Sequence, residues 1–197
     1  MSDLATFMQV DLQNLFYGAR SCEKKIEEDI RTRKIQGSGP VKIKIDFEKI
    51  WTYFNDRNAE FLTDAIVYLI KGEDFDSNKF ETKIKSLGYK TKSKTLVKVV
   101  KKGETFFQQT NNTVAITVDC MSKINTFDKW ILMSGNGDFA DLCRYLRQKR
   151  KKIEIWSFKE CFSSTLEPYA DKIHFISDDF LYKSPNVSVF GFNWDIQ

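Results

Sequence analysis

Apolar and polar residues follow two different periods along this chain, and residues 130–158 show both of them most clearly. Residues 130–133 form a short apolar run, which a Ser-Gly-Asn-Gly sequence interrupts. Four apolar residues then recur between Phe139 and Leu146 at the spacing i, i+3, i+4, i+7, which is the period of a helix. Residues 153–158 alternate with period two, as strands do. This order predicts a β-α-β unit and therefore a parallel sheet.

The same periods predict most of the other elements. Residues 111–124 carry two signals, because their β-branched residues favour a strand, whereas Val114, Val118 and Met121 have helical spacing. Since a parallel strand at residues 130–133 needs a crossover before it, we predict a helix there. The chain is thus expected to have an α/β fold with a central, mostly parallel sheet. Further strands are predicted over residues 5–10, 61–70, 95–100 and 172–176, and helices after Asp11, after Asp46, over residues 75–87 and from Ser163.

Composition indicates a globular protein. The chain has 197 residues, of which 42% are hydrophobic and 29% are charged, so it can bury a core. We expect one domain over residues 1–182, with a flexible insertion near residues 34–42, and an aromatic tail over residues 183–197. A disordered tail rarely holds three large aromatic residues, so this tail is expected to dock on the domain, on a protein partner or in a homodimer. No segment typical of secretion or membrane insertion is present, which favours a cytoplasmic protein.

Cysteine and histidine do not indicate a zinc site. The four cysteines form no C-x-x-C pair, and His174 is the only histidine. His174 lies in a predicted strand, where we expect an edge or surface position. A role as general base is the alternative.

A run of lysines is the strongest charge feature, although the formal net charge is only +4. No acidic residue lies between Glu81 and Glu104. Lysines on an edge strand prevent aggregation, so a solvated edge is one interpretation, and a surface for nucleic acid is the other. The run comprises Lys83, Lys85, Lys90, Lys92, Lys94, Lys98, Lys101 and Lys102, and the residues expected to contact nucleic acid are Lys90, Lys92, Lys94, Lys98, Arg144 and Arg147.

Asp11 ends the first predicted strand and precedes a helix. A carboxylate at the end of a buried strand is unfavourable unless something binds it. Asp11 can cap the helix by accepting a hydrogen bond from a free backbone amide, or it can bind a metal, with Asn14 placed to orient water or phosphate. Sites of parallel sheets lie at the carboxyl ends of the strands, where Asp11 is expected together with Asn136, Asp138 and Asp141.

Five segments occur in a fixed order along the chain and together carry a resemblance. They are Val10-Asp11-Leu12-Gln13-Asn14-Leu15, Ile45-Asp46-Phe47, Leu87-Gly88-Tyr89, Val114-Ala115-Ile116-Thr117-Val118-Asp119 and Ser134-Gly135-Asn136-Gly137-Asp138-Phe139. In this order they resemble the NYN domain family, in particular the LabA-like (DUF88) branch of the PIN-like nucleases, and the resemblance covers residues 7–176. It implies a PIN-like three-layer α/β/α sandwich and metal-dependent endonuclease activity, usually on RNA.

The resemblance also implies a site. Its catalytic residues would be Asp11, Asn14, Asp119 and Asp138, and its metal ligands for Mg²⁺ or Mn²⁺ would be Asp11, Asp119, Asp138 and Asn136. Three positions differ from the family pattern. Asn136 and Thr113 stand where the family usually has aspartates, and Thr110 stands where it often has a lysine.

Two functions follow from these residues. The first is a metal-dependent endonuclease, acting on RNA, in which the ion activates water and stabilises charge on the scissile phosphate. The alternative is a catalytically weakened or inactive protein of the NYN fold that acts as an RNA-binding or scaffold module, since an asparagine oxygen binds Mg²⁺ more weakly than a carboxylate. A phosphatase with an aspartyl nucleophile is a weaker third possibility, because Asp11-Leu12-Gln13 lacks a second aspartate.

Overall fold

Six parallel strands form the central sheet. Their bounds are Leu4–Asp11 (β1), Glu60–Lys71 (β3), Lys90–Thr95 (β4), Lys129–Met133 (β7), Lys152–Ser157 (β8) and Lys172–Phe175 (β9). The computed structural model describes residues 4–32, 41–56, 60–71, 77–96, 98–101, 104–107 and 111–183. The strand order in the sheet is β4-β3-β1-β7-β8-β9, and every neighbouring pair is parallel. The predicted parallel sheet is therefore confirmed.

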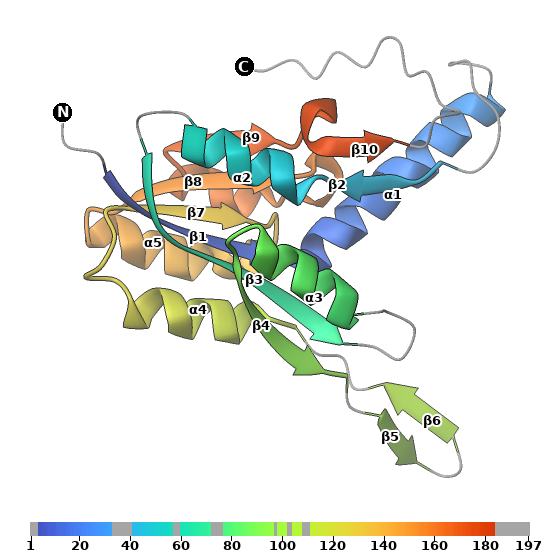
Figure 1. Cartoon of the computed structure of the whole chain (residues 1–197), viewed down its shortest axis with the longest axis horizontal. Helices are drawn as coiled ribbons and strands as arrows, with labels where there is room; N and C mark the ends of the chain where they lie inside the picture. The colour runs from blue at the N-terminus through green and yellow to red at the C-terminus, as the bar shows by residue number, and fades with distance from the viewer. Residues whose placement is uncertain are drawn as a thin grey trace.

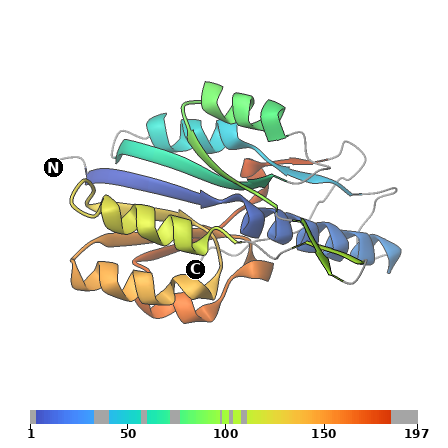
Figure 2. The same ribbon diagram turned by 90° about the horizontal axis from the view of Figure 1, so that it is seen from below.

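Helices cover both faces of the sheet and produce the predicted three layers (Figures 1 and 2). One face carries α1 (Leu12–Arg31), α2 (Phe47–Asp56) and α3 (Ser77–Ser86), and the other carries α4 (Thr113–Ser122) and α5 (Ala140–Gln148). The alternation of β1 explains the two cores. Met8 and Val10 pack beneath α1, α2 and α3, whereas Phe7 packs beneath α4 and α5. The helix predicted within residues 111–124 is confirmed as α4.

Two small antiparallel pairs lie outside the main sheet. In the first, β2 (Ile43–Ile45) pairs with β10 (Leu181–Lys183), and in the second, β5 (Lys98–Lys101) pairs with β6 (Glu104–Phe107). The prediction of one strand over residues 95–100 is wrong, because β4 ends at Thr95 and β5 begins at Lys98 in a hairpin of its own. The edge strand β4 pairs only with β3 and is largely exposed, so its sequence has no apolar period to reveal it.

Other boundaries follow local chemistry. Gly88 ends α3 with a φ of +103°, the left-handed conformation expected of a glycine after a helix. The helix predicted from Ser163 is a short 3₁₀ helix, η3 (Ser164–Tyr169), which contains Pro168 and therefore lacks one amide donor. The remaining 3₁₀ turns are η1 (Gly137–Phe139), η2 (Lys159–Cys161) and η4 (Asp178–Phe180).

His174 lies on β9, the outermost strand of the sheet, which confirms the predicted edge position. Its ring stacks on Trp156, with centroids 4.4 Å apart, and its Nε2 lies 3.0 Å from Glu154 Oε1. Lys129 Nζ lies 2.5 Å from the other oxygen of Glu154. Burial alone would raise the pKa of Glu154, but the contacts with His174 and Lys129 lower it to about 2. Glu154 and Lys129 thus form a buried ion pair beside the stacked rings of Trp156 and His174, between β7, β8 and β9.

The chain changes direction across the sheet between β1 and β7. From β1 it builds β3 and β4 on one side, and from β7 it builds β8 and β9 on the other. Such a switch point leaves a crevice at the carboxyl ends of the two strands, where ligands of open α/β sheets bind. The glycine-containing segment 36–40 and the aromatic tail from Ser184 lie outside the described residues.

Candidate functional site

Asp11 stands at the carboxyl end of β1 and begins α1. Its side chain is buried, and its Oδ1 accepts a hydrogen bond from the Asn14 amide at 3.4 Å, which confirms the predicted helix cap. Its Oδ2 accepts a hydrogen bond from Ser134 Oγ at 3.2 Å. Burial raises the pKa of Asp11, and these hydrogen bonds only partly oppose the effect. All hydrogen bonds that Asp11 accepts within the described ranges come from neutral groups.

The loop after β7 is held against Asp11 by a chain of hydrogen bonds. The Gly135 amide donates to Asn14 Oδ1 at 2.8 Å, and the Asn136 amide donates to Ser134 Oγ at 3.2 Å. Asn136 Oδ1 accepts from the Asp138 amide at 3.1 Å, and its Nδ2 lies 3.3 Å from Asp138 Oδ2. The structure thus brings Asp11, Asn14, Asn136 and Asp138 into one connected network at the β1–β7 switch point.

Gly135 has no room for a side chain. A Cβ atom there would lie 2.2 Å from the backbone carbonyl oxygen of Cys161. Because that neighbour is backbone, it cannot move aside as a side chain would. Glycine therefore allows the loop to approach η2 and keeps its amide aimed at Asn14.

Two of the three positions that differ from the family pattern, Thr113 and Asn136, are in contact with each other. Thr113 is the first residue of α4, and its Oγ1 accepts a hydrogen bond from Asn136 Nδ2 at 3.2 Å. Both side chains are neutral and half-buried. The side of the crevice that α4 contributes consequently carries no negative charge at this point.

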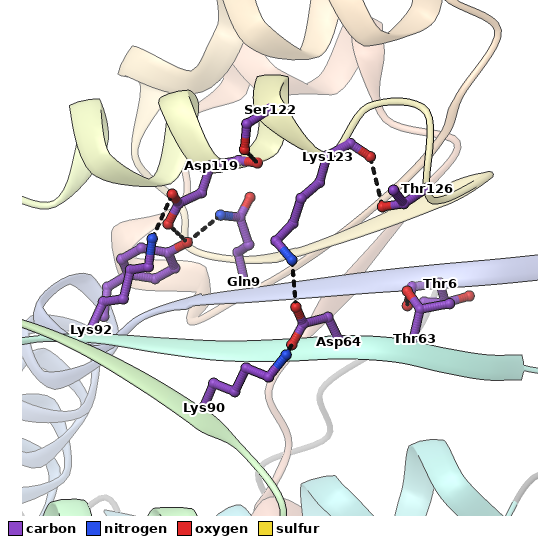
Figure 3. A network of polar contacts seen from close by, with 11 residues as sticks. Thr6, Gln9, Thr63, Asp64, Lys90, Lys92, Asp119, Ser122, Lys123 and Thr126 are labelled. Atoms are coloured by element: carbon purple, nitrogen blue, oxygen red, sulfur yellow. Dashed lines mark hydrogen bonds and ion pairs between the residues drawn. The ribbon is translucent and has the colours of Figure 1, made fainter.

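Asp119 belongs to a second network, shown in Figure 3. Its Oδ2 accepts a hydrogen bond from Tyr68 Oη at 2.6 Å, and its Oδ1 pairs with Lys92 Nζ at 2.7 Å. Tyr68 Oη in turn accepts from Gln9 Nε2 at 2.6 Å, and Trp130 Nε1 donates to Gln9 Oε1 at 2.9 Å. Burial and the hydrogen bond to Asp119 raise the pKa of Tyr68. Both oxygens of Asp119 are therefore occupied by groups of the sheet.

The lysines of β4 also have partners. Lys90 Nζ lies 3.0 Å from Asp64 Oδ1, and Lys123 Nζ lies 2.7 Å from Asp64 Oδ2 (Figure 3). Lys94 Nζ donates to the Asn111 carbonyl at 2.8 Å. The acids that balance this charge come from β3 and α4, which explains why the sequence of the run alone shows none. The side chain of Lys98 lies outside the described residues.

The two predicted arginines lie on α5. Arg144 pairs with Asp141 at 2.9 Å, and Arg147 Nη1 donates to the Tyr169 carbonyl at 3.2 Å. Both side chains remain exposed. Exposed pairs of this kind are weak, so these cations stay available to a phosphate.

The residues present fit a divalent ion with few protein ligands. Mg²⁺ commonly binds one or two carboxylates and keeps several waters, which Asp11 and Asp138 allow, with the Asn136 carbonyl as a neutral oxygen. The desolvated carboxylate of Asp11, with its raised pKa, would gain from such a cation. A centre of three carboxylates does not fit: among the described residues, no three or more histidine, cysteine, aspartate or glutamate side chains could hold a metal together.

The sequence did not indicate Ser134 or Tyr68. Ser134 is fully buried, and its hydroxyl connects Asp11 to the Asn136 amide. The sequence feature that could have indicated Ser134 is its position directly after an apolar strand, where the site of a parallel sheet lies. Tyr68 lies opposite Asp11 in the register of β1 and β3, so only the pairing of the strands reveals its place.

The parallel sheet and its helical layers define an α/β protein with a three-layer α/β/α sandwich. Residues 6–179 match the model of the NYN domain, and the chain belongs to the NYN domain family. This family comprises PIN-like nucleases, generally dependent on divalent metals, so membership supports a nuclease-like role. No helix in the part of the chain that the structure describes is long and apolar enough to cross a membrane.

The chain is also similar to a protein of known name and to a solved structure. The chain is 27% identical over 135 residues to the low amplitude and bright protein LabA of Synechococcus elongatus, covering 68% of this chain and 73% of that protein. This similarity supports the LabA-like branch. A crystal structure of a protein of unknown function from Vibrio parahaemolyticus has the same fold, with a TM-score of 0.69 and 23% identity, covering 91% of this chain and 97% of the other.

Proposed function

We propose that this protein is an endonuclease that uses a divalent metal ion to hydrolyse phosphodiester bonds in RNA, at the carboxyl ends of β1 and β7. One observation carries the proposal. Asp11 is a buried carboxylate with a raised pKa, and hydrogen bonds through Ser134 and Asn136 connect it to the exposed Asp138. An ionised group so placed is unfavourable for folding and is consistent with a binding function.

Asp11 and Asp138 would hold the ion. When bound, Mg²⁺ or Mn²⁺ supplies positive charge that stabilises the scissile phosphate and lowers the pKa of water. Asn14 accepts a hydrogen bond from the Gly135 amide and so fixes the loop. The side chain of Asn136 orients Asp138 by bonding to both its backbone amide and its carboxylate. Both carboxylate oxygens of Asp119 are bonded to Tyr68 and Lys92, so Asp119 would position α4 beside the site rather than bind the ion directly.

Exposed cations would bind the flanking backbone of the nucleic acid. Lys90 and Lys92 have side chains that are 69% and 53% exposed despite their acidic partners. Each of these lysines can meet a phosphate with its exposed end while it stays beside its largely buried acid, Asp64 or Asp119. Arg144 and Asp141 form a solvent-exposed pair, which contributes about 1 kcal/mol or less, so exchanging that carboxylate for a phosphate requires little energy. Arg147 is exposed as well. Lys94 and Lys98 complete the proposed contacts.

The test is cleavage of an end-labelled RNA by the full chain with Mg²⁺, with Mn²⁺ and with a chelator. Asp11→Asn and Asp138→Asn should each lower the rate by at least about a hundredfold, since each removes charge next to the ion. Asp141→Asn is the matched control, because Asp141 is exposed on α5 and pairs with Arg144 outside the network. Equal cleavage by wild type, Asp11→Asn and Asp138→Asn would show that this mechanism is wrong.

A second function is favoured by the contact between Thr113 and Asn136. This neutral pair lowers the charge available to a metal, which supports a catalytically weakened or inactive protein that binds RNA or serves as a scaffold. Such a protein would bind RNA with strong dependence on salt and show no metal-dependent turnover. The same samples distinguish the two functions when RNA affinity is measured beside cleavage.

A further inference from the structure

Two hydroxyl groups lie against the loop that carries Asp138. Ser163 Oγ and Thr165 Oγ1 are 2.8 Å apart, and a Cβ atom at Gly137 would lie 2.7 Å from the first and 2.8 Å from the second. The Ser163 amide donates to the Gly135 carbonyl at 2.9 Å, which fixes the start of η3 to the same loop. The absence of a side chain at Gly137 thus keeps both hydroxyls beside the candidate site.

This hydroxyl pair has unused hydrogen-bonding capacity. Each hydroxyl has one donor and two acceptor sites, and their mutual bond uses one donor and one acceptor. Within the described residues, neither hydroxyl makes a hydrogen bond other than this mutual one, and Thr165 is exposed. One O–H donor and several acceptor sites remain for a ligand that approaches from the exposed side of Thr165.

The surroundings favour a neutral ligand. Neither hydroxyl is bonded to a lysine or arginine in the described ranges, and Asp138 is the next residue after Gly137. A phosphate placed there would be repelled by the carboxylate, whereas a hydroxyl group would not. A ribose 2′-hydroxyl both donates and accepts hydrogen bonds, as this pair does, and DNA lacks it.

We propose that Ser163 and Thr165 bind the 2′-hydroxyl of a nucleotide next to the site and so select RNA over DNA. This inference rests on the proposed function. It assigns a sugar-binding role to η3 and gives a reason for glycine at position 137.

The experiment compares binding of one labelled single-stranded RNA and the DNA of the same sequence by fluorescence anisotropy, on the full chain with a chelator to prevent turnover. The variants are Ser163→Ala, Thr165→Val and the double variant. Ser164→Ala is the matched control, because Ser164 is an exposed neighbour on the same turn. Thr165→Ser retains the hydroxyl and should retain RNA affinity. Thermal unfolding verifies that each variant is folded.

We expect the double variant to lose about tenfold in RNA affinity, the effect of one or two hydrogen bonds, with DNA affinity unchanged. Equal losses for RNA and DNA would indicate phosphate contacts and overturn the inference. Unchanged RNA affinity in the double variant, with wild type binding RNA, would overturn the inference alone. Wild type that binds neither polymer would overturn the proposed function as well.

Discussion

Asn136 donates a hydrogen bond from Nδ2 to Thr113 Oγ1 over 3.2 Å. In the family pattern both positions are aspartates, and two carboxylates this close repel each other unless a cation lies between them. Here a neutral hydrogen bond joins the β7 loop to α4. A metal ion near this contact would meet two neutral side chains in place of two carboxylates.

Placing aspartates at positions 113 and 136, as in the family pattern, should make the thermal stability of the protein depend on Mg²⁺. The double variant Thr113→Asp/Asn136→Asp is expected to unfold at a lower temperature than wild type in a chelator and to recover with Mg²⁺, because the ion neutralises the added charges. Its Mg²⁺ affinity, measured by calorimetry, should exceed that of wild type by at least about tenfold. Gln148→Glu adds a charge on the exposed end of α5 and serves as control. An unfolding temperature of the double variant that does not change when Mg²⁺ is added would contradict this prediction.

Replacing Asp11 should stabilise the apoprotein. Its pKa is raised by burial, so at pH 7 its ionised form lowers the free energy of unfolding. Asp11→Asn should therefore raise the unfolding temperature by about 2–4 °C at pH 7, and the difference should shrink as pH falls through the raised pKa towards 3.8. Mg²⁺ should stabilise wild type and not the variant. Scanning calorimetry at several pH values checks both expectations, and a destabilised variant at pH 7 would refute them.

Asp119 and Lys92 should behave as a structural pair. Asp119→Asn is expected to lower the unfolding temperature, since Tyr68 Oη and Lys92 Nζ lose a charged partner, while Mg²⁺ affinity stays within about twofold of wild type. With Lys92→Met and the double variant, a thermodynamic cycle should give a coupling of about 1 kcal/mol. Loss of Mg²⁺ binding in Asp119→Asn would instead make Asp119 a ligand, as the family resemblance implies.

Glu154 should make stability depend on acid. Its pKa falls from 4.5 to about 2, so its contribution is complete above pH 4.5 and is lost as pH falls towards about 2. The free energy of unfolding of Glu154→Gln should be about 3 kcal/mol lower than that of wild type at pH 7. This difference in unfolding free energy should narrow below pH 4.5. Urea unfolding between pH 7 and pH 3 measures this. Glu167→Gln, at an exposed position, is the matched control.

The sequence predicted those elements whose burial leaves a clear pattern. In β7, residues 130–133 are a continuous apolar run buried on both faces, and α5 is an amphipathic helix with a helical period; both were found. The edge strand β4 has no apolar face to bury. The strand β2 has only three residues, and its partner β10 comes much later in the sequence. Their existence depends on tertiary pairing, which local patterns do not encode.

The candidate site could be predicted only in part for the same reason. Asp11, Asn14, Asn136 and Asp138 follow from strand ends and motifs, and the structure connects them. The partners of Asp119 could not be predicted, because Lys92 and Tyr68 are brought to it from β4 and β3. Charge balance of this kind is set by strand order rather than by spacing along the chain.

The hydrogen bond from Ser134 to Asp11 spans 123 positions of sequence. Translation releases a chain in order, so Asp11 leaves the ribosome long before the strand that completes its surroundings. Until β7 has been made and has paired with β1, the growing polypeptide holds a lone carboxylate without the hydroxyl, the loop or Asp138. Under the proposed function, the nascent protein is therefore inert towards RNA until β7 has paired with β1.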